Sequence, residues 1–229
     1  MPDTRFSWRA LREHLRKYLW VYLVGIAVCL VGTNLLWTTT RPRAENFEAV
    51  TVYMADAYSN PDPLSGVAAR MLEACQARDE TLREVSFESL MYTENDYNSS
   101  MLLMTRLAVG EADAFLASQA AMEALVSSDI LVRLDESVDG GWLSGYDLEP
   151  FYATVEDEET GASETYLAGL KLDNVTALGQ MGAFNNSGAY LCVTQNGGNV
   201  ETTMRALEVM VEALTAWQPE VEDAGTEAS

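Results

Sequence analysis

Few residues beyond the first forty could take part in acid–base or nucleophilic chemistry. The one histidine, His14, precedes a long apolar segment. The rest of the chain therefore lacks every Ser-His or Cys-His catalytic pair and every histidine-based zinc site. Its only lysine is Lys171, and no serine precedes it in the S-x-x-K spacing of a Ser-Lys pair. No glycine-rich phosphate loop follows the first predicted strand. These absences point away from an enzyme and away from a bound cofactor.

Carboxylates are abundant, and one group of them could bind a metal. Glu156, Asp157, Glu158 and Glu159 follow one another, and carboxylate oxygens are the ligands that Ca²⁺ prefers. The group lacks the alternation and the glycine of an EF-hand loop. We therefore interpret it as a solvated loop and predict no metal site.

The stretch "TRLAVGEADAFLASQAAMEAL" reads as the end of a helix, a glycine stop, a short apolar strand and a new helix. Ser118 stands where the strand ends and the helix begins, a position at which serine caps helices. The alternative is that Ser118 and Gln119 bind a ligand, since a helix N-terminus favours an anionic or carbonyl group. We favour capping.

An N-terminal apolar segment predicts a membrane anchor. Residues 18–37 contain no charge, and Thr38 to Thr40 extend the run. Twenty helical residues span roughly the 30 Å hydrocarbon core of a bilayer. Five basic residues precede the run and only two follow it closely, which predicts a cytoplasmic amino terminus. A cleaved signal peptide is the alternative, although its apolar region would be shorter.

The charge of −21 is unevenly distributed. Residues 1–43 hold seven Lys or Arg and two acids, whereas the remainder holds seven basic residues and 33 acids. So acidic a body repels phosphate backbones, which excludes nucleic acid as a partner. The sequence predicts five segments. They are a cytoplasmic segment (residues 1–17), a transmembrane helix (18–40), a linker (41–46), an extracellular α/β domain (47–217) and an acidic disordered tail (218–229).

The external domain alternates between strand and helix patterns. Apolar β-forming runs predict strands, and residues spaced three or four apart predict helices between them. One helix is expected after an Asp62 cap, and another from Asp96 through Tyr97, Met101, Met104 and Ala108 to a stop at Gly110. A less regular section is expected around Trp142 and Phe151. This order predicts one mostly parallel sheet lobe wrapped by helices. Cys75 and Cys192 are expected to be buried thiols.

The stretch from Asn95 to Glu136 resembles the first lobe of bacterial extracellular solute-binding proteins of ABC transporters. The resemblance lies in a "G-x-A-D" turn ending at Asp113, a short strand, a helix, and a closing Leu134-Asp135. "TYLAGLKL" is similar to the family's strand toward the hinge, and "AYLCVTQ" to its returning strand. Between them the family has a second lobe, whereas here about sixteen residues intervene. The resemblance therefore implies a single periplasmic-binding-protein-like lobe.

The resemblance also implies where a ligand would bind. The family's contacts come from the loop after the first strand and from the step after the third. The corresponding residues here are Asp56, Tyr58, Ser59, Ser118 and Gln119. A lone lobe would leave one side of a ligand in water, which weakens binding.

Three functions follow as hypotheses. The first is a membrane-anchored extracellular interaction module that acts with a protein partner, for example a membrane transporter subunit, on the face that would meet the missing lobe. The second is a direct receptor for a small solute, completed by dimerisation or by a second chain. The third, an enzyme, is disfavoured by the missing catalytic pairs.

Overall fold

The computed structural model describes residues 8–40, 48–156, 163–185, 188–195 and 200–219. The chain forms two compact units, Met1–Arg43 and Ala44–Ser229. Each unit is described by itself.

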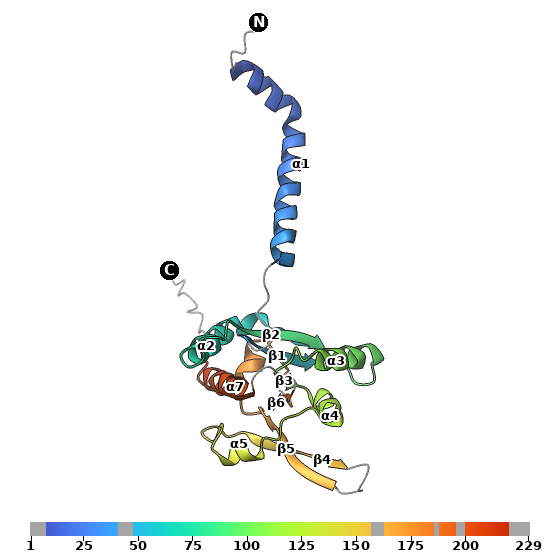
Figure 1. Ribbon diagram of the computed structural model, residues 1–229, viewed down its shortest axis with the longest axis vertical. Coiled ribbons are helices and arrows are strands. Elements are labelled where there is room, and N and C mark those ends of the chain that lie inside the picture. Colours follow the sequence, from blue (N-terminus) through green and yellow to red (C-terminus); the bar gives the residue numbers. More distant parts are fainter. Residues whose placement is uncertain (1–7, 41–47, 157–162, 186–187, 196–199, 220–229) are drawn as a thin grey trace, which may run out of the picture. The chain divides into compact units, whose positions relative to one another are not determined.

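The first unit is the helix α1, Trp8–Thr40 (Figure 1). Its stretch Arg16–Thr33 is long and apolar enough to cross a membrane by length and composition. Side chains such as Trp20 and Leu30 are exposed there, so no protein core covers them. The predicted helix is therefore present, and its insertion in a membrane remains a prediction.

The second unit is an α/β domain built on one six-stranded sheet in the order β2-β1-β3-β6-β5-β4. Four strands point one way: β2 and β3 pair parallel to β1, β6 pairs antiparallel to β3, and β5 and β4 continue antiparallel. This confirms an α/β fold with a mostly parallel sheet. The strands, from β1 to β6, are Ala49–Asp56, Glu84–Met91, Ala114–Ala117, Glu149–Glu156, Ser163–Lys171 and Tyr190–Val193.

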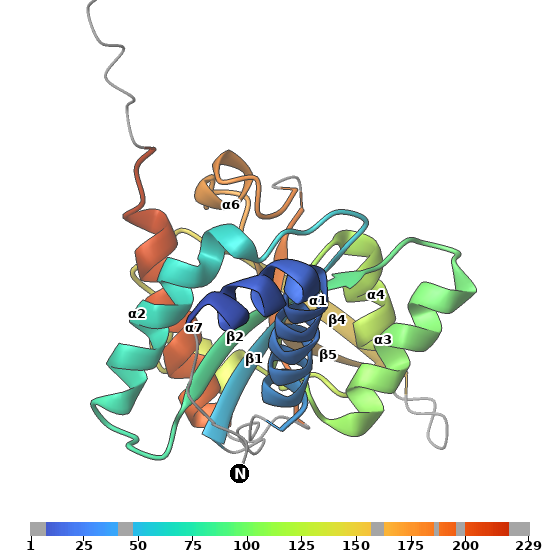
Figure 2. The ribbon, with the colours of Figure 1, turned by 90° about the horizontal axis from the view of Figure 1, so that it is seen from above.

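Helices cover both faces of the sheet (Figure 2). On one face α2, Ser65–Gln76, packs beside α7, Val200–Thr215, and on the other lie α3, Tyr97–Val109, and α4, Gln119–Ser127. Strand β1 contributes to the hydrophobic cores on both faces of the sheet, because its successive side chains point to opposite faces. Val50, Val52 and Met54 are buried in the α2–α7 core, and Tyr53 and Ala55 in the α3–α4 core.

The ends of α3 are fixed by local interactions that the sequence predicts. The Asp96 carboxylate accepts hydrogen bonds from the backbone N–H groups of Asn98 and Ser99, at 3.2 and 3.3 Å. Gly110 ends the helix at φ 71°, a left-handed conformation that glycine adopts without steric cost. The expected helix is therefore confirmed, and so are the two signals that bound it.

Two expectations about smaller elements are wrong. Asp62 does not cap α2: it lies in a short 3₁₀ helix, Asp62–Leu64, and its own backbone N–H donates to the Asn60 side chain at 3.2 Å. The section around Phe151, expected to be irregular, contains β4, which forms a hairpin with β5.

Two short helices complete the domain, α5 at Asp135–Asp139 and α6 at Ala177–Gln180.

Gly169 marks the closest approach between β5 and its surroundings. A Cβ atom there would lie 2.8 Å from the carbonyl oxygen of Leu191 and 3.0 Å from the terminal carbon of Met122. Only glycine therefore lets β5 pack against β6 and α4 at this point.

Candidate functional site

The resemblance places ligand contacts at the carboxyl ends of β1 and β3, and the fold brings these two ends together. Ala55 pairs with Ala117 across the strands, and the Ser118 N–H donates to the Ala55 carbonyl at 2.8 Å. Asp56, the last residue of β1, is therefore a neighbour of Ser118. Residues sixty positions apart thus share one edge of the sheet, as expected for strands of one parallel sheet.

The hydroxyl of Ser59 is already engaged within the protein. It donates to the Met54 carbonyl at 3.0 Å and lies 2.7 Å from the hydroxyl of Ser89. Asp56 accepts the Ala57 N–H at 2.8 Å, and partial burial raises the pKa of its carboxyl. These interactions hold the loop after β1 against the end of β2.

Ser118 acts as the helix cap that the sequence favours. Its hydroxyl oxygen accepts the backbone N–H of Ala121 at 3.4 Å. The exposed Gln119 donates to the Glu123 carboxylate at 3.1 Å, and Tyr58 is exposed to solvent. The carboxylate of Asp56 at the same edge of the sheet opposes binding of an anion there. This edge is therefore suited to a polar or cationic group, rather than to the anion that a helix N-terminus alone would favour.

The connection between β5 and β6 packs over this same edge. The Asn60 N–H donates to the Ala183 carbonyl at 2.8 Å, and Ser59 forms a β-bridge with Phe184. Leu178 and Phe184 are buried in the α2–α7 core. Figure 2 shows α6 at the end of the sheet where the loop after β1 also lies. A short packed connection therefore stands where a second lobe would begin.

The two acids in the motifs that carry the resemblance bind backbone groups. The Asp113 carboxylate accepts the Thr51 N–H at 2.7 Å, which ties the start of β3 to β1. The Asp135 carboxylate accepts the Leu167 N–H at 3.0 Å, which ties α5 to β5. Both residues belong to the motifs that carry the resemblance, but these hydrogen bonds were not predicted from the sequence. Both acids are structural, because each satisfies a backbone donor far away in the sequence.

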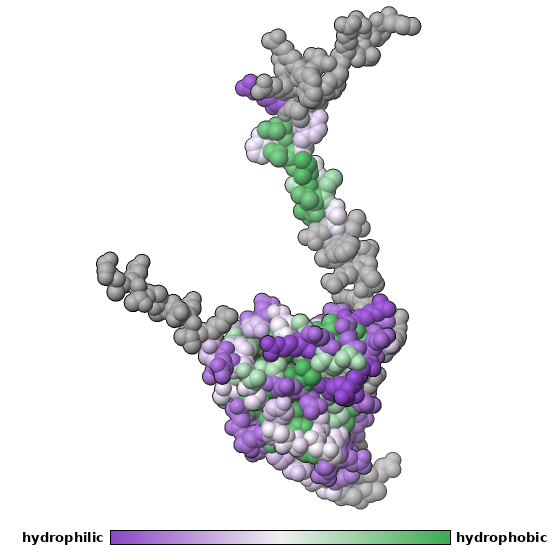
Figure 3. All heavy atoms as spheres, turned by 90° about the vertical axis from the view of Figure 1, so that its left-hand side faces the viewer, coloured by the Kyte–Doolittle hydropathy of each residue, from purple (hydrophilic) through white to green (hydrophobic). Residues whose placement is uncertain are grey.

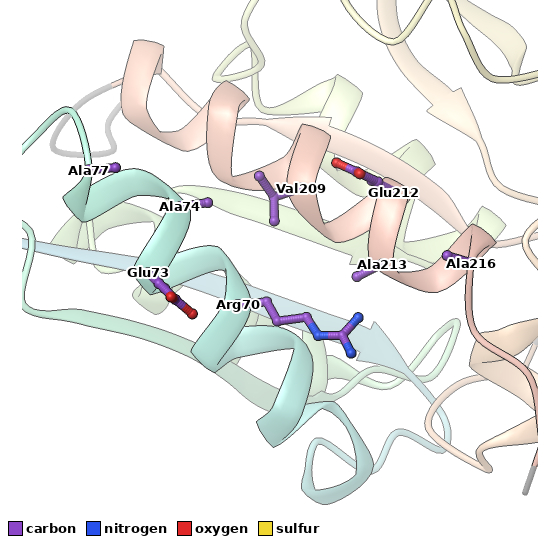
Figure 4. Close-up of a pocket in the computed structure, with 8 residues that line it drawn as sticks. All are labelled: Arg70, Glu73, Ala74, Ala77, Val209, Glu212, Ala213 and Ala216. Carbon is purple, nitrogen blue, oxygen red and sulfur yellow. The ribbon is translucent and has the colours of Figure 1, made fainter.

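A groove of about 480 Å³ lies between α2 and α7, and Figure 4 shows the residues that line it. Ala74, Ala77, Ala213 and Ala216 contribute small side chains to its wall, with charged residues such as Arg70 alongside. The groove brings together no nucleophile and base. It therefore has the chemistry of a packing surface and not of an active site.

The outward side of α3 is mostly apolar and carries no charge, with Asn98 and Thr105 as its exposed polar residues. Its large apolar side chains remain solvent-exposed, whereas Leu103 and Leu107 point into the core. The exposed fractions are 75% for Tyr97, 57% for Met101, 42% for Leu102, 41% for Met104 and 57% for Val109. Sequence reasoning found the stripe through Tyr97 and Met101 but gave no sign that it faces solvent. We call Tyr97, Met101, Leu102, Met104, Ala108 and Val109 the α3 face.

The two cysteines of the α/β domain are buried in its core. Cys75 and Cys192 are buried free thiols, as expected, and burial raises the pKa of Cys192 to about 12. No cluster of metal-ligating residues occurs within the described parts of the chain. The acidic group from Glu156 to Glu159 lies outside the residues whose side chains are described.

No protein-family model matches the chain, and no curated protein or solved structure matches it. The resemblance to solute-binding proteins therefore remains a prediction from short motifs.

Proposed function

We propose that this protein is a membrane-anchored extracellular interaction module that acts with a protein partner. The observation that carries the proposal is the α3 face. Soluble domains rarely leave a contiguous set of large apolar side chains exposed unless something binds there. The rest of the domain is strongly acidic, and the surface of a soluble domain normally carries charged residues. A helix face without any charge is therefore not explained by the need for solubility.

The helix α1 supports the anchor. Its stretch Arg16–Thr33 has the length and composition to cross a bilayer, and the basic residues concentrate before it. On the positive-inside rule the amino terminus is cytoplasmic and the acidic domain extracellular.

The docking surface that we propose differs from the one expected from the resemblance. A partner was expected on the face that would meet the missing lobe, with an apolar patch there. At that edge the apolar residues of the β5–β6 connection, Leu178 and Phe184, are buried. Tyr58 and Met91, which pairs with Asp56 across the strands, are the large apolar side chains exposed among the described residues there. The α3 face offers more apolar surface, so we assign the partner to it.

We further propose that this module is similar to one lobe of a solute-binding protein. Two features support the similarity: β1, β2 and β3 are parallel, and β6 returns antiparallel beside β3. The short connection between β5 and β6 replaces the second lobe of that family and supports a single lobe. A lobe without its clamshell partner suits a role in binding another protein more than a role in enclosing a solute.

A photo-cross-linking amino acid in place of Met101 tests the proposal in native membranes. We expect a discrete adduct that contains this chain and a bound protein. A matched position is Glu208, which is exposed on α7 at the other face of the sheet. Adducts of equal yield at both positions, or none at Met101, would refute a partner on the α3 face.

A second candidate function is a receptor for a small solute, because Asp56, Ser59 and Ser118 gather at one edge of the sheet. Thermal unfolding of the full chain against sugars, amino acids, short peptides and metal ions would test it. A ligand at 100 times its Kd adds about 2.7 kcal/mol to the free energy of unfolding. The Asp56→Ala variant should lose that gain, and a ligand that stabilises both chains equally binds elsewhere.

A further inference from the structure

We infer that the occupant of the α3 face is a second copy of this chain, bound with the two α3 helices antiparallel across a two-fold axis. The inference rests on the proposed function, because it names the partner of the interaction module. Charge, area and side-chain size each point to a second copy.

Charge restricts which part of the domain can meet its own copy. Two copies of an acidic domain repel each other through most surfaces, because a two-fold contact places like residues near like residues. The exposed face of α7, for example, would bring Glu208 and Glu212 against their own copies. The helix α3 carries a single charged residue, Arg106, which forms an ion pair with Glu111 of its own chain. Self-contact through the α3 face therefore brings no acids together on the helix itself.

The exposed area is sufficient for a weak dimer. The large apolar side chains of the α3 face expose roughly 500 Å² per copy, on the scale of 150–250 Å² for one aromatic side chain. A symmetric contact that buried all of this surface would remove about 1,000 Å² in total, which is the lower limit for a specific interface. Anchoring both copies in one membrane would raise their effective concentration and so favour such a small contact.

The sizes of the side chains make the α3 face self-complementary. Tyr97, Met101, Met104 and Ala108 follow the i, i+4, i+7, i+11 spacing that lines one side of a helix. The bulky Tyr97 is at one end and the small Ala108 at the other. When two such helices run antiparallel, each Tyr97 packs over the partner's Ala108, and the methionines meet in the middle. A parallel pair would place tyrosine on tyrosine and leave a gap at the alanines.

Engineered disulfides test this arrangement in the full chain reconstituted in liposomes. The background carries Cys29→Ala, because that thiol is exposed, whereas Cys75 and Cys192 are buried. Chains with Tyr97→Cys and chains with Ala108→Cys are reconstituted separately and as a mixture, and then oxidised. Within one chain the two positions are about 16 Å apart along the helix, too far for a disulfide. We expect the mixture to give at least ten times more disulfide-linked dimer than either chain alone.

Three controls make the result decisive. Thermal unfolding shows that each cysteine variant is folded, and Glu208→Cys on α7 measures random collision. Dimers in the mixture no more frequent than those of the Glu208→Cys chain would overturn the inference. Efficient dimers from Tyr97→Cys alone would overturn the antiparallel arrangement, since they indicate parallel helices.

The mass of the photo-adduct at Met101 separates this inference from the proposed function. An adduct of twice the mass of this chain supports both. An adduct with a different protein leaves the interaction module in place and overturns the second copy as its partner. Without any adduct at Met101, both proposals fail.

Discussion

The helices α3 and α7 cover opposite faces of the same sheet, and they differ in what they show to solvent. On α7 three of the exposed positions are acidic: Glu201, Glu208 and Glu212. On α3 no exposed position is charged; the large exposed side chains are tyrosine, methionine, leucine and valine, with Asn98 and Thr105 between them. Figure 3 shows the side of the domain on which α2 and α7 lie, where hydrophilic residues surround smaller apolar patches.

The inward sides of the two helices are alike. Leu103 and Leu107 of α3 and Leu207 and Val211 of α7 are buried against the sheet. Packing in the core therefore does not require the difference on the outward sides. A solvated helix normally places charged residues there, as α7 does, so the apolar surface of α3 calls for a partner.

The largest expected effect concerns the buried sides of α3 and α7, which should contribute equally to stability. Leu103→Ala and Leu207→Ala each remove a side chain that is 0% exposed, and each should lower the free energy of unfolding by about 3 kcal/mol. Denaturant unfolding measures both variants. Met101→Ala and Glu208→Ala are the outward controls, expected within about 0.5 kcal/mol of the parent chain when it is monomeric. If Met101→Ala cost as much as Leu103→Ala, Met101 would belong to the core and the α3 face would not exist.

The next effect tests the difference between the outward sides. Met101→Lys places a charge in the proposed contact, close to the same lysine of the second copy, and should weaken dimerisation at least tenfold, or by 1.4 kcal/mol. Energy transfer between labelled chains in liposomes measures the association. Thr215→Lys adds the same charge to the exposed end of α7 and should leave association unchanged. Equal losses in both variants would mean that the contact is not specific to the α3 face.

Most of this fold is predictable because its signals are local. Asp96 and Gly110 mark the ends of α3, and Ser118 marks the start of α4, each by an interaction within four residues. The strand β4 was missed for a local reason too. It contains Pro150, lies at the edge of the sheet, and changes register between Phe151 and Tyr152, which breaks the alternation that identifies a strand.

The features that bear on function are less predictable because they depend on tertiary placement. The helix α3 has apolar residues on both sides, so the spacing of Tyr97, Met101 and Met104 looks the same as that of a buried stripe. Only packing of Leu103 against the sheet shows which side faces outward. The acid of the "G-x-A-D" turn likewise bonds Thr51, sixty-two positions away, a contact that no local pattern indicates.

A smaller effect is expected at the start of α3. Asp96→Ala removes the acceptor for the Asn98 and Ser99 N–H groups and should cost about 1 kcal/mol. Fraying of this first turn would also displace position 97. It would therefore lower the yield of the disulfide between chains with Tyr97→Cys and chains with Ala108→Cys. Asp96→Asn keeps a side-chain oxygen and should retain most of both properties. Unfolding and cross-linking measured on the same two variants would show whether the cap positions the α3 face or only stabilises the helix.

The smallest effect concerns acid, to which the two helices should respond differently. The Asp79 carboxylate accepts two hydrogen bonds from Thr81 and one from Thr202 of α7 at 3.3 Å, and these bonds lower its pKa below the ordinary 3.8. A lowered pKa in the folded state stabilises the fold above the ordinary value, and the stabilisation is lost as the pH falls through the lowered one. No such titration is expected within the α3 face, which contains no acid.

Denaturant unfolding at about pH 5, 4 and 3 would measure this difference. The parent chain should lose stability with acid slightly more steeply than Asp79→Asn, because the variant has no carboxylate to protonate at that position. The Tyr97–Ala108 cross-link, scored at the same pH values with a pH-independent thiol reagent, should persist or increase, since protonation of the other carboxylates reduces repulsion between copies. A cross-link that disappears with acid while the domain remains folded would show that carboxylates contribute to the contact, and the apolar α3 face would then not account for association.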